Sequence, residues 1–309
     1  MTSGTRDRRR AEKATGAPGR CPNRVFISLV YPAERRPLKG AAAFMCGIAG
    51  YSLSPDSRVK RTLAAQALLA GISERGADAV GYAVRDLDGS IDVTKLRGGA
   101  SALLDEIAVP ASASQALLHV RDFTKGHPDV EANNHPIRHG SVVGVHNGVI
   151  ANDDELFAHY ELDRFTPEMT VDSEIIFALM AHHAHRPRAL RKLHGTMAAA
   201  WLDEARPQSV FLARGLGRPV WVGSTSTELF FASTRRALAI VEAALRVRLH
   251  ARTLREGRLL EVVDGRIART RRFRPDRRYR EEEAVSPVHS PHEAVSCLAH
   301  FAAIASTAG

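Results

Sequence analysis

The pattern of hydrophobic and polar residues along the chain predicts a mixture of strands and helices. Residues 80–84 alternate as a half-buried strand does, and residues 62–73 carry hydrophobic residues at helical spacing. Further strands are predicted directly after residue 46 and at 115–120, 141–146, 197–202, 209–213, 219–223, 229–232, 259–263 and 267–272. Further helices are predicted at 153–160, 173–183 and 235–244. Periodicity alone therefore indicates a mixed α and β protein.

The composition changes after Phe273, which predicts the edge of a domain. Residues 274–283 are rich in basic and then acidic side chains, as in a linker. The sequence Ser290-Pro291-His292-Glu293 then predicts a capping box with proline at the first helical position. The hydrophobic residues of this last helix fall on one face, which either folds back on the domain or docks a partner; they are Val295, Leu298, Ala302 and Ala305.

The net charge of +9 over 309 residues is concentrated at the start of the chain. Residues 1–44 hold ten Lys or Arg and three Asp or Glu (net +7), whereas the other 265 residues hold 33 and 31 (net +2). A nearly neutral domain argues against a nucleic-acid partner. No stretch approaches the ~18 uninterrupted apolar residues of a membrane span, so we expect no membrane partner.

Residues 1–45 are predicted to be a basic extension that does not belong to the folded domain. Their apolar run, residues 25–31, is interrupted by Pro32, and no signal-peptide cleavage site follows that would free Cys46. The extension is interpreted as a translation start placed too early or as a removable propeptide, with a retained arm as the alternative. The predicted organisation is therefore an extension (1–45), one domain (46–273), and a charged linker with a short helix (274–309).

Cys46 is the strongest candidate for chemistry. If Met45 is the true start and is removed, the Cys46 thiol and a free α-amine share one residue. A thiol has a pKa near ~8.5 and an α-amine one near ~7.7–8.0, so the amine can take the thiol proton near neutral pH. A chain that keeps residues 1–45 has no such base and should be inactive. The alternative is a small hydrophobic residue at the start of a buried strand.

Four later motifs accompany Cys46-Gly47-Ile48 in a fixed order: Arg75-Gly76-Ala77-Asp78-Ala79-Val80-Gly81, His119-Val120-Arg121, His146-Asn147-Gly148 and Val171-Asp172-Ser173-Glu174. With Cys46 they resemble the class II glutamine amidotransferases, which are N-terminal-nucleophile hydrolases, and most of all the glutaminase domain of glucosamine-6-phosphate synthase. The resemblance covers about residues 46–273. It implies an α+β fold, a four-layer αββα sandwich of two antiparallel sheets.

The resemblance also implies catalytic roles. Cys46 would attack the side-chain amide of L-glutamine, and Asn147 with Gly148 would form the oxyanion hole. An amide side chain and a backbone N–H are suitable donors to a developing O⁻. Asn-Gly is also the favoured two-residue hairpin connection, so a turn is the alternative for this dipeptide, and a sharp turn is one way to present the hole.

The substrate-binding residues follow in the same way. Arg121 would hold the glutamine α-carboxylate bidentately, Asp172 the α-ammonium, and Thr124 would contribute to binding. Asp172 also suits the N-terminus of a helix. Arg75 and Asp78 would order the loop near Cys46, with a surface ion pair as the alternative.

The chain departs from the family motif after Arg121. Where the family has Arg-Trp-Ala-Thr-His-Gly, this chain has Arg-Asp-Phe-Thr-Lys-Gly, residues 121–126. The missing Trp leaves closure of the lid loop over glutamine open, and Phe123 is a candidate replacement. Lys125 either contacts the carboxylate or is solvated. Ala79 replaces the motif serine and removes one hydrogen-bonding group.

These observations predict a glutaminase subunit that hydrolyses glutamine through a Cys46 thioester and passes ammonia to a separate synthase. The alternatives are a hydrolase of another amide or γ-glutamyl compound, and a non-enzymatic glutamine sensor. The three cysteines have no CxxC spacing, which argues against a disulfide framework or a zinc site and fits a reducing cytoplasm. We expect no cofactor and no metal, and a group of three histidines (182, 183 and 185) is interpreted as lying at a helix C-terminus.

Overall fold

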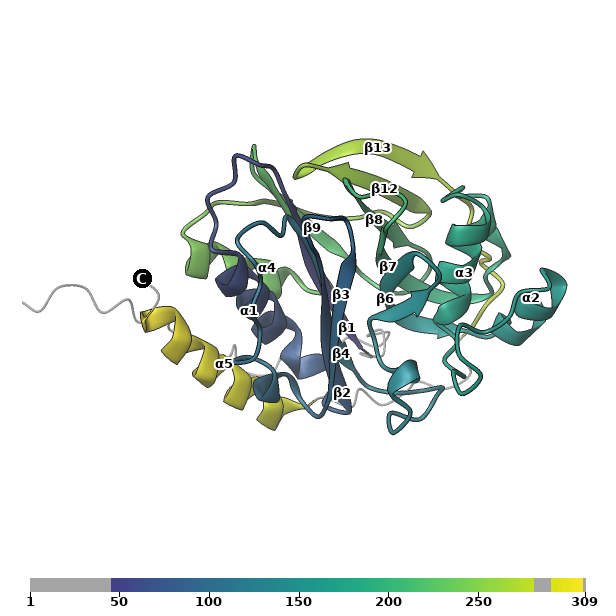
Figure 1. Cartoon of the computed structure of the whole chain (residues 1–309), viewed down its shortest axis with the longest axis horizontal. Helices are drawn as coiled ribbons and strands as arrows, with labels where there is room; N and C mark the ends of the chain where they lie inside the picture. Colours follow the sequence, from purple (N-terminus) through teal and green to yellow (C-terminus); the bar gives the residue numbers. More distant parts are fainter. Residues whose placement is uncertain (1–45, 281–289, 308–309) are drawn as a thin grey trace, which may run out of the picture. The chain divides into compact units, whose positions relative to one another are not determined.

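The structure, a computed structural model, describes residues 46–280 and 290–307. The predicted extension 1–45 and most of the predicted linker (281–289) lie outside the described residues. Two antiparallel sheets lie face to face, with helices on the outer face of each (Figure 1). The predicted α+β sandwich of four layers is therefore confirmed.

The first sheet has seven strands and contains the strand that follows Cys46. In spatial order they are β11 (His250–Thr253), β9 (Trp221–Ser224), β10 (Glu228–Ala232), β1 (Gly47–Leu53), β4 (Gln115–Arg121), β2 (Ala79–Arg85) and β3 (Ile91–Arg97). Neighbouring strands pair antiparallel, and β1 lies at the centre between β10 and β4. All seven residues of β1 are buried, because both of its faces are covered.

The second sheet has six strands, again paired antiparallel. In spatial order they are β13 (Arg266–Arg272), β12 (Arg258–Val263), β8 (Ser209–Arg214), β7 (Gly195–Asp203), β6 (Val142–Ile150) and β5 (Ile137–His139). The longest two, β6 and β7, pair along their whole length from Val142 opposite Asp203 to Ile150 opposite Gly195. This is the longest strand pairing in the sheet.

Each sheet carries its own helices on its outer face. The first is covered by α1 (Arg61–Ile72), α4 (Arg235–Leu245) and α5 (Pro291–Thr307), and the second by α2 (Asp153–His159) and α3 (Glu174–His182) (Figure 1). In α4 the Thr234 side chain accepts a hydrogen bond from the Ala237 N–H, which satisfies one free donor of the first turn. Within the described residues, no helix is both long and apolar enough to cross a membrane.

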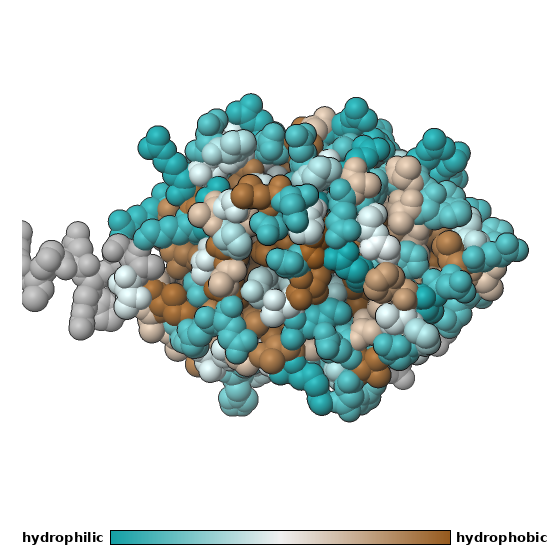
Figure 2. Space-filling view, viewed as in Figure 1, coloured by the Kyte–Doolittle hydropathy of each residue, from teal (hydrophilic) through white to brown (hydrophobic). Residues whose placement is uncertain are grey.

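Three hydrophobic cores separate the four layers. One lies between the first sheet and α1, α4 and α5, one between the two sheets, and one between the second sheet and α3. In β1, Ala49, Tyr51 and Leu53 belong to the helix-side core, whereas Ile48 belongs to the core between the sheets. On the face shown in Figure 2, hydrophobic residues form small patches among hydrophilic ones, as expected where most apolar surface is buried.

The strand predictions missed three strands and one long extension. β3, β5 and β11 are short or partly exposed edge strands without a clear alternation of hydrophobic residues. The predicted strand at 141–146 continues to Ile150, so Asn147 and Gly148 pair with Ala198 and Met197 inside a strand. The hairpin-turn alternative for this dipeptide is wrong, and so is the expectation that a sharp turn presents it.

The last helix folds back on the domain, one of the two alternatives left open. The predicted capping box is wrong, because the Glu293 carboxylate accepts from the backbone N–H and the hydroxyl of Ser101 instead. The predicted face is also partly wrong: Val295 is 56% exposed, whereas Ala294, Cys297 and Phe301 are buried beside Leu298. The buried face differs from the predicted one because the helix packs against α1 and η1 (Ser73–Arg75), which follows α1.

Candidate active site

Cys46 lies at the start of β1 and is held by backbone groups. Its thiol is 3.2 Å from the carbonyl of Asp122, to which it donates, and the Asp122 N–H lies 3.4 Å from the sulfur. The Arg75 Nε donates to the Cys46 carbonyl at 2.8 Å. Burial raises the pKa of the Cys46 thiol to about 11, against the opposing effects of the Asp122 contact and of nearby Arg121. The thiol is therefore protonated at neutral pH and needs a base to become a nucleophile.

Because side chains alternate along a strand, Cys46, Arg121 and Asn147 all face the layer between the two sheets. Cys46 shares the face of β1 that carries Ile48, which packs between the sheets. On β4, Arg121 shares the face of Leu117, and on β6, Asn147 shares the face of Val145; both partners belong to the same core. Because Gly47 pairs with Val120, Cys46 and Arg121 come next to each other at the end of their strands. The polar site is thus the open end of the hydrophobic layer between the sheets.

Asn147 is buried and its amide is unsatisfied. It has no exposed surface, and among the described residues neither its nitrogen nor its oxygen has a hydrogen-bond partner. A buried amide without partners costs about 1–3 kcal/mol, so it marks a place where a ligand group can supply the missing bond.

Gly148 follows Asn147 in a conformation that only glycine adopts readily. Its φ is +144°, and a Cβ there would lie 2.0 Å from the carbonyl oxygen of Thr196. The backbone can therefore bend beside Asn147 while β6 stays paired with β7.

Arg121 is buried and organises the loop that follows it. Its Nη1 donates to Oδ1 of Asn134 at 2.5 Å, and its Nη2 donates to the carbonyls of Lys125, at 2.9 Å, and Gly126. The guanidinium lies close enough to Cys46 to lower the pKa of its thiol. Arg121 thus connects the nucleophile, the segment 122–126 and Asn134.

Asp172 is 2% exposed, and its Oδ2 accepts the Ile150 N–H at 2.6 Å. It lies just before α3, and this hydrogen bond places it at the end of β6, three residues beyond Asn147. Burial raises the pKa of its carboxyl to about 6, with a further contribution from Asp153. A carboxylate that is hard to ionise when alone is a natural partner for a cationic ligand group.

The segment 122–126 is fixed by contacts on both sides. The Phe123 N–H donates to Oδ2 of Asp78 at 3.0 Å, and the Lys125 ammonium pairs with Asp153 at 2.7 Å and Asp154 at 3.0 Å. Burial disfavours the charge of Lys125, but these carboxylates outweigh it and raise its pKa. Lys125 is therefore paired with two carboxylates of this chain and not simply solvated, whereas a contact to a substrate carboxylate stays a prediction.

Two side chains of this segment remain at the surface. Phe123 is 42% exposed and Thr124 is exposed as well. The Phe123 ring lies 5.4 Å from the ring of His127, and its role as a replacement for the Trp of the family motif stays a prediction.

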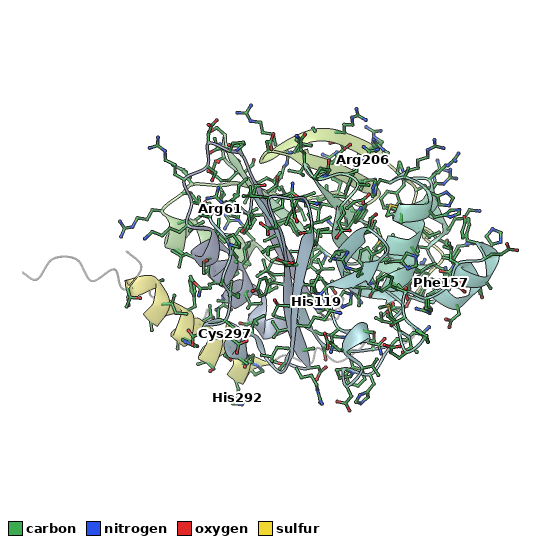
Figure 3. The ribbon with its side chains drawn as sticks, in the orientation of Figure 1. Arg61, His119, Phe157, Arg206, His292 and Cys297 are labelled. Atoms are coloured by element: carbon green, nitrogen blue, oxygen red, sulfur yellow. The ribbon has the colours of Figure 1, made fainter. Side chains whose placement is uncertain are left out.

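Two buried histidines were not predicted as site residues. His119 on β4 faces the layer between the sheets, whereas His146 on β6 faces α3, on the opposite side from Asn147. The His119 Nε2 lies 3.0 Å from the His146 carbonyl and must donate to it, and the Ser173 hydroxyl contacts the His146 Nδ1 at 2.8 Å (His119 is labelled in Figure 3). Burial lowers the pKa of each to about 3, so both are neutral at neutral pH. The alternation of β4 is the signal that could have placed His119 on the same face as Arg121.

The histidines at the end of α3 do not form a metal site. His185 is buried, accepts from the Trp201 indole at 3.1 Å, and donates to Asp203 at 2.7 Å. In the part of the chain that the structure describes, no three His, Cys, Asp or Glu side chains are grouped to hold a metal ion. A cavity of about 460 Å³ nearby contains none of the predicted site residues and is lined by Tyr160, His183, Arg188, Ala189, Arg191 and Lys192.

Comparison with known proteins identifies the domain by sequence. A family model described as a glutamine amidotransferase domain matches residues 120–240. The chain is 31% identical over 208 residues to a glutamine–fructose-6-phosphate aminotransferase (isomerizing) of Shigella flexneri, covering 63% of this chain and 32% of that protein. The Vibrio parahaemolyticus protein of the same name is 27% identical over 231 residues, covering 71% and 35%. The chain spans about a third of the length of these relatives.

Two solved structures share the fold. The glutamine phosphoribosylpyrophosphate amidotransferase from B. subtilis superposes with a TM-score of 0.58 at 18% identity, covering 74% of this chain and 49% of that chain. A structure described as the allosteric regulatory enzyme of purine biosynthesis gives 0.59 at 19% identity, with the same coverage.

These matches support the resemblance to the class II glutamine amidotransferases that the motifs indicated. As in the resemblance drawn from the motifs, the matched family model includes Arg121, Asn147 and Asp172. Cys46, Arg75 and Asp78 lie outside the residues that the model matches, and their place in an amidotransferase site depends on the geometry described above.

The raised pKa of Asp172 generates a stability prediction for this amidotransferase domain. The folded carboxyl has a pKa of about 6 against an ordinary value of 3.8, so the folded state binds the proton more tightly. Stability from this group is therefore full at low pH and decreases as the pH rises through 6. Asp172→Asn removes the buried charge and keeps an acceptor for Ile150. It should raise the free energy of unfolding by about 1–3 kcal/mol at pH 8 and change it little at pH 4, measured by urea unfolding.

Asp203→Asn is the matched control with the opposite sign. Burial disfavours the Asp203 charge, but hydrogen bonds from His185, Ser141 and the Ala205 N–H outweigh it and lower its pKa. Its stabilisation is present at pH 8 and lost as the pH falls, so this variant should be less stable at pH 8. If Asp172→Asn lowered stability at pH 8 as Asp203→Asn does, the buried carboxylate would be stabilising and our interpretation of its environment wrong.

Proposed function

We propose that the chain hydrolyses L-glutamine to glutamate and ammonia, with Cys46 as nucleophile. The observation that carries this proposal is the unsatisfied amide of Asn147, buried on the same inter-sheet face as the thiol. A substrate oxyanion would supply the acceptor that the Asn147 NH₂ group lacks. The matches to a glutamine amidotransferase domain and to glutamine-dependent aminotransferases support glutamine as the substrate.

The proposed reaction has two halves. The Cys46 sulfur attacks the side-chain amide carbon of glutamine while the Cys46 α-amine takes the thiol proton. The amide oxygen becomes an oxyanion that accepts hydrogen bonds from the Asn147 side chain and the Gly148 N–H. The C–N bond breaks, the amine returns its proton to the leaving group, and ammonia departs. Water then attacks the thioester, releasing glutamate and restoring the thiol.

The glutamine head group is proposed to bind between Arg121 and Asp172. The guanidinium would take the α-carboxylate, which replaces the loop carbonyls of Lys125 and Gly126 as its acceptors. The Asp172 carboxylate would take the α-ammonium and would be held ionised by it. Thr124, exposed on the same loop, is proposed to complete the pocket when the loop moves. Arg75 and Asp78 are proposed to position the Cys46 backbone and the loop.

The mechanism requires Cys46 to be the first residue of the active protein. Burial holds the thiol pKa at about 11, so a nearby base must remove its proton. The α-amine of a first residue can be that base, but a peptide nitrogen cannot, because it has no basic lone pair. We therefore propose that residues 1–45 are absent from the active form. The predicted cytoplasmic location stays a prediction.

The first experiment compares the full chain with a form that begins at Cys46. The shorter form should release glutamate and ammonia from glutamine, and a diazo-ketone glutamine analogue should add one adduct at Cys46, measured by coupled assay and peptide mass spectrometry. The full chain should show neither, because its Cys46 nitrogen is acylated.

The control for contaminating glutaminase is the same short form with Cys46→Ser, so that it begins with Ser at position 46. A short form that binds glutamine without turnover would contradict the proposal and indicate a glutamine sensor. Turnover of another amide or γ-glutamyl compound in preference to glutamine would indicate a different hydrolase.

Asn147→Ala tests the oxyanion hole separately from folding. Losing one such donor typically lowers kcat by about 10²–10³-fold. Because the amide has no partner in the described structure, its loss breaks no internal hydrogen bond, and the free energy of unfolding should fall by less than about 1 kcal/mol.

Asn152→Ala is the matched control for that variant. The Asn152 amide bonds to the Lys192 carbonyl and the His194 N–H, so its loss should cost stability and leave kcat unchanged. Equal kcat values for the Asn147 variant and the wild type would remove Asn147 from the mechanism.

The ammonia acceptor is proposed to be a separate synthase. The residues matched by this chain correspond to about a third of the aminotransferase relatives. Purification from the native host should recover a second protein in stoichiometric amount that raises the glutaminase rate. Full glutaminase activity with no such protein would indicate an enzyme that simply makes ammonia and glutamate.

A further inference from the structure

The short helix η1 (Ser73–Arg75) connects Cys46 to the outer helical layer. The Arg75 side chain is 2% exposed, and its Nε holds the Cys46 carbonyl at 2.8 Å. A Cβ built on Gly47 would lie 3.2 Å from the Arg75 Cδ, so the arginine packs directly on the β1 backbone. A shift of η1 therefore moves the residue that carries the thiol.

α5 and the residue before it contact Ser73 and Glu74, the other two residues of η1. The Ser290 N–H, at the start of α5, donates to the Glu74 carbonyl at 3.2 Å. The Cys297 side chain has no exposed surface and lies close enough to Ser73 for that side chain to lower the pKa of the thiol, against the larger opposite effect of burial. Figure 3 labels Cys297 on α5, the helix that packs against α1 and η1.

The first turn of α5 is itself fastened to the domain. The Glu293 carboxylate accepts from the Ser101 N–H at 2.6 Å and from the Ser101 hydroxyl at 2.5 Å. A Cβ on Gly99 would lie 2.2 Å from the Glu293 carboxyl carbon, so any side chain at position 99 would displace the Glu293 carboxylate. η1 is also held from the side of α4, where the Glu74 side chain pairs with Arg236 at 2.9 Å.

We propose that α5 is a positioning element of the active site, which holds η1 and, through Arg75, the carbonyl of Cys46. Glu293 and Cys297 are positioning residues in this arrangement. α5 lies outside residues 120–240, which match the amidotransferase family model. The inference rests on the proposed function for its effect on turnover, since a nucleophile displaced by 1 Å can lose about 10²-fold in rate.

The experiment uses Glu293→Ala, with His300→Ala as the matched control. His300 lies two helical turns beyond Glu293 on the same helix and pairs with Asp105 at 3.0 Å. In the full chain, iodoacetamide should alkylate Cys46 about three- to tenfold faster in Glu293→Ala, at a lower pH midpoint, because the thiol becomes less buried. Peptide mass spectrometry assigns the adduct to Cys46.

In the form that begins at Cys46, kcat per site should fall about three- to tenfold, while KM for glutamine stays within about twofold, because α5 contacts neither Arg121 nor Asp172. Sites are counted with the diazo-ketone analogue. Glu293→Gln keeps an acceptor for Ser101 and should recover most of the loss. His300→Ala should leave the alkylation rate, kcat and KM unchanged.

Two outcomes would overturn the inference. In the first, Glu293→Ala and His300→Ala behave alike in alkylation and in kcat per site. In the second, Glu293→Ala lowers only the number of sites, with kcat per site unchanged, which is the signature of a helix that serves stability alone. An inactive wild-type short form would refute the proposed glutaminase, whereas the alkylation profile of Cys46 would still decide the role of α5.

Discussion

The pairing of β1 with β4 is the constraint on which the site depends. Its register places Gly47 opposite Val120, which brings Cys46 beside Arg121 and turns both toward the second sheet. A slip of one residue would point the thiol into the helix-side core and Ile48 with it, because side chains alternate with a period of two. The flanking cores make that slip unfavourable: Ala49 and Val120 fit the helical layer, whereas Ile48 fits the layer between the sheets.

The same burial that fixes the register makes the site costly to maintain. The thiol and the Asp172 carboxyl have raised pKa values because water is excluded from them, and the Asn147 amide lies buried without a partner among the described residues. None of these groups stabilises the fold in its present state, and the proposed substrate, an amino-acid amide with a charged head group, would satisfy each of them. Functional sites commonly break the rules that the rest of a fold obeys, and here the violations cluster at one end of one layer.

The sequence predicted most elements because they are long and regular. Helix α1 and strand β7 are continuous runs of mostly hydrophobic residues, and the ordered motifs indicated the family. The edge strands β3, β5 and β11 escaped prediction because their exposed positions weaken the alternation. The Asn-Gly dipeptide looked like a turn, since local propensity cannot reveal the pairing with β7 that keeps it extended. Likewise, the partner of Glu293 is Ser101, almost two hundred residues away, and no local rule favours it over a capping box.

The contacts around Cys46 explain how the chain departs from the family motif without losing its geometry. The thiol touches the N–H and carbonyl of residue 122, the Cys46 carbonyl is held by Arg75, and Asp78 receives the N–H of residue 123. Residues 122 and 123 contribute through their backbones, so an Asp where the motif has Trp preserves these bonds. What the substitution changes is the surface above the thiol, where a half-buried carboxyl with a pKa raised to about 6 by burial and by Asp78 replaces an indole. The scaffold that positions the nucleophile is therefore independent of the side chains that cover it, and the cover is free to diverge.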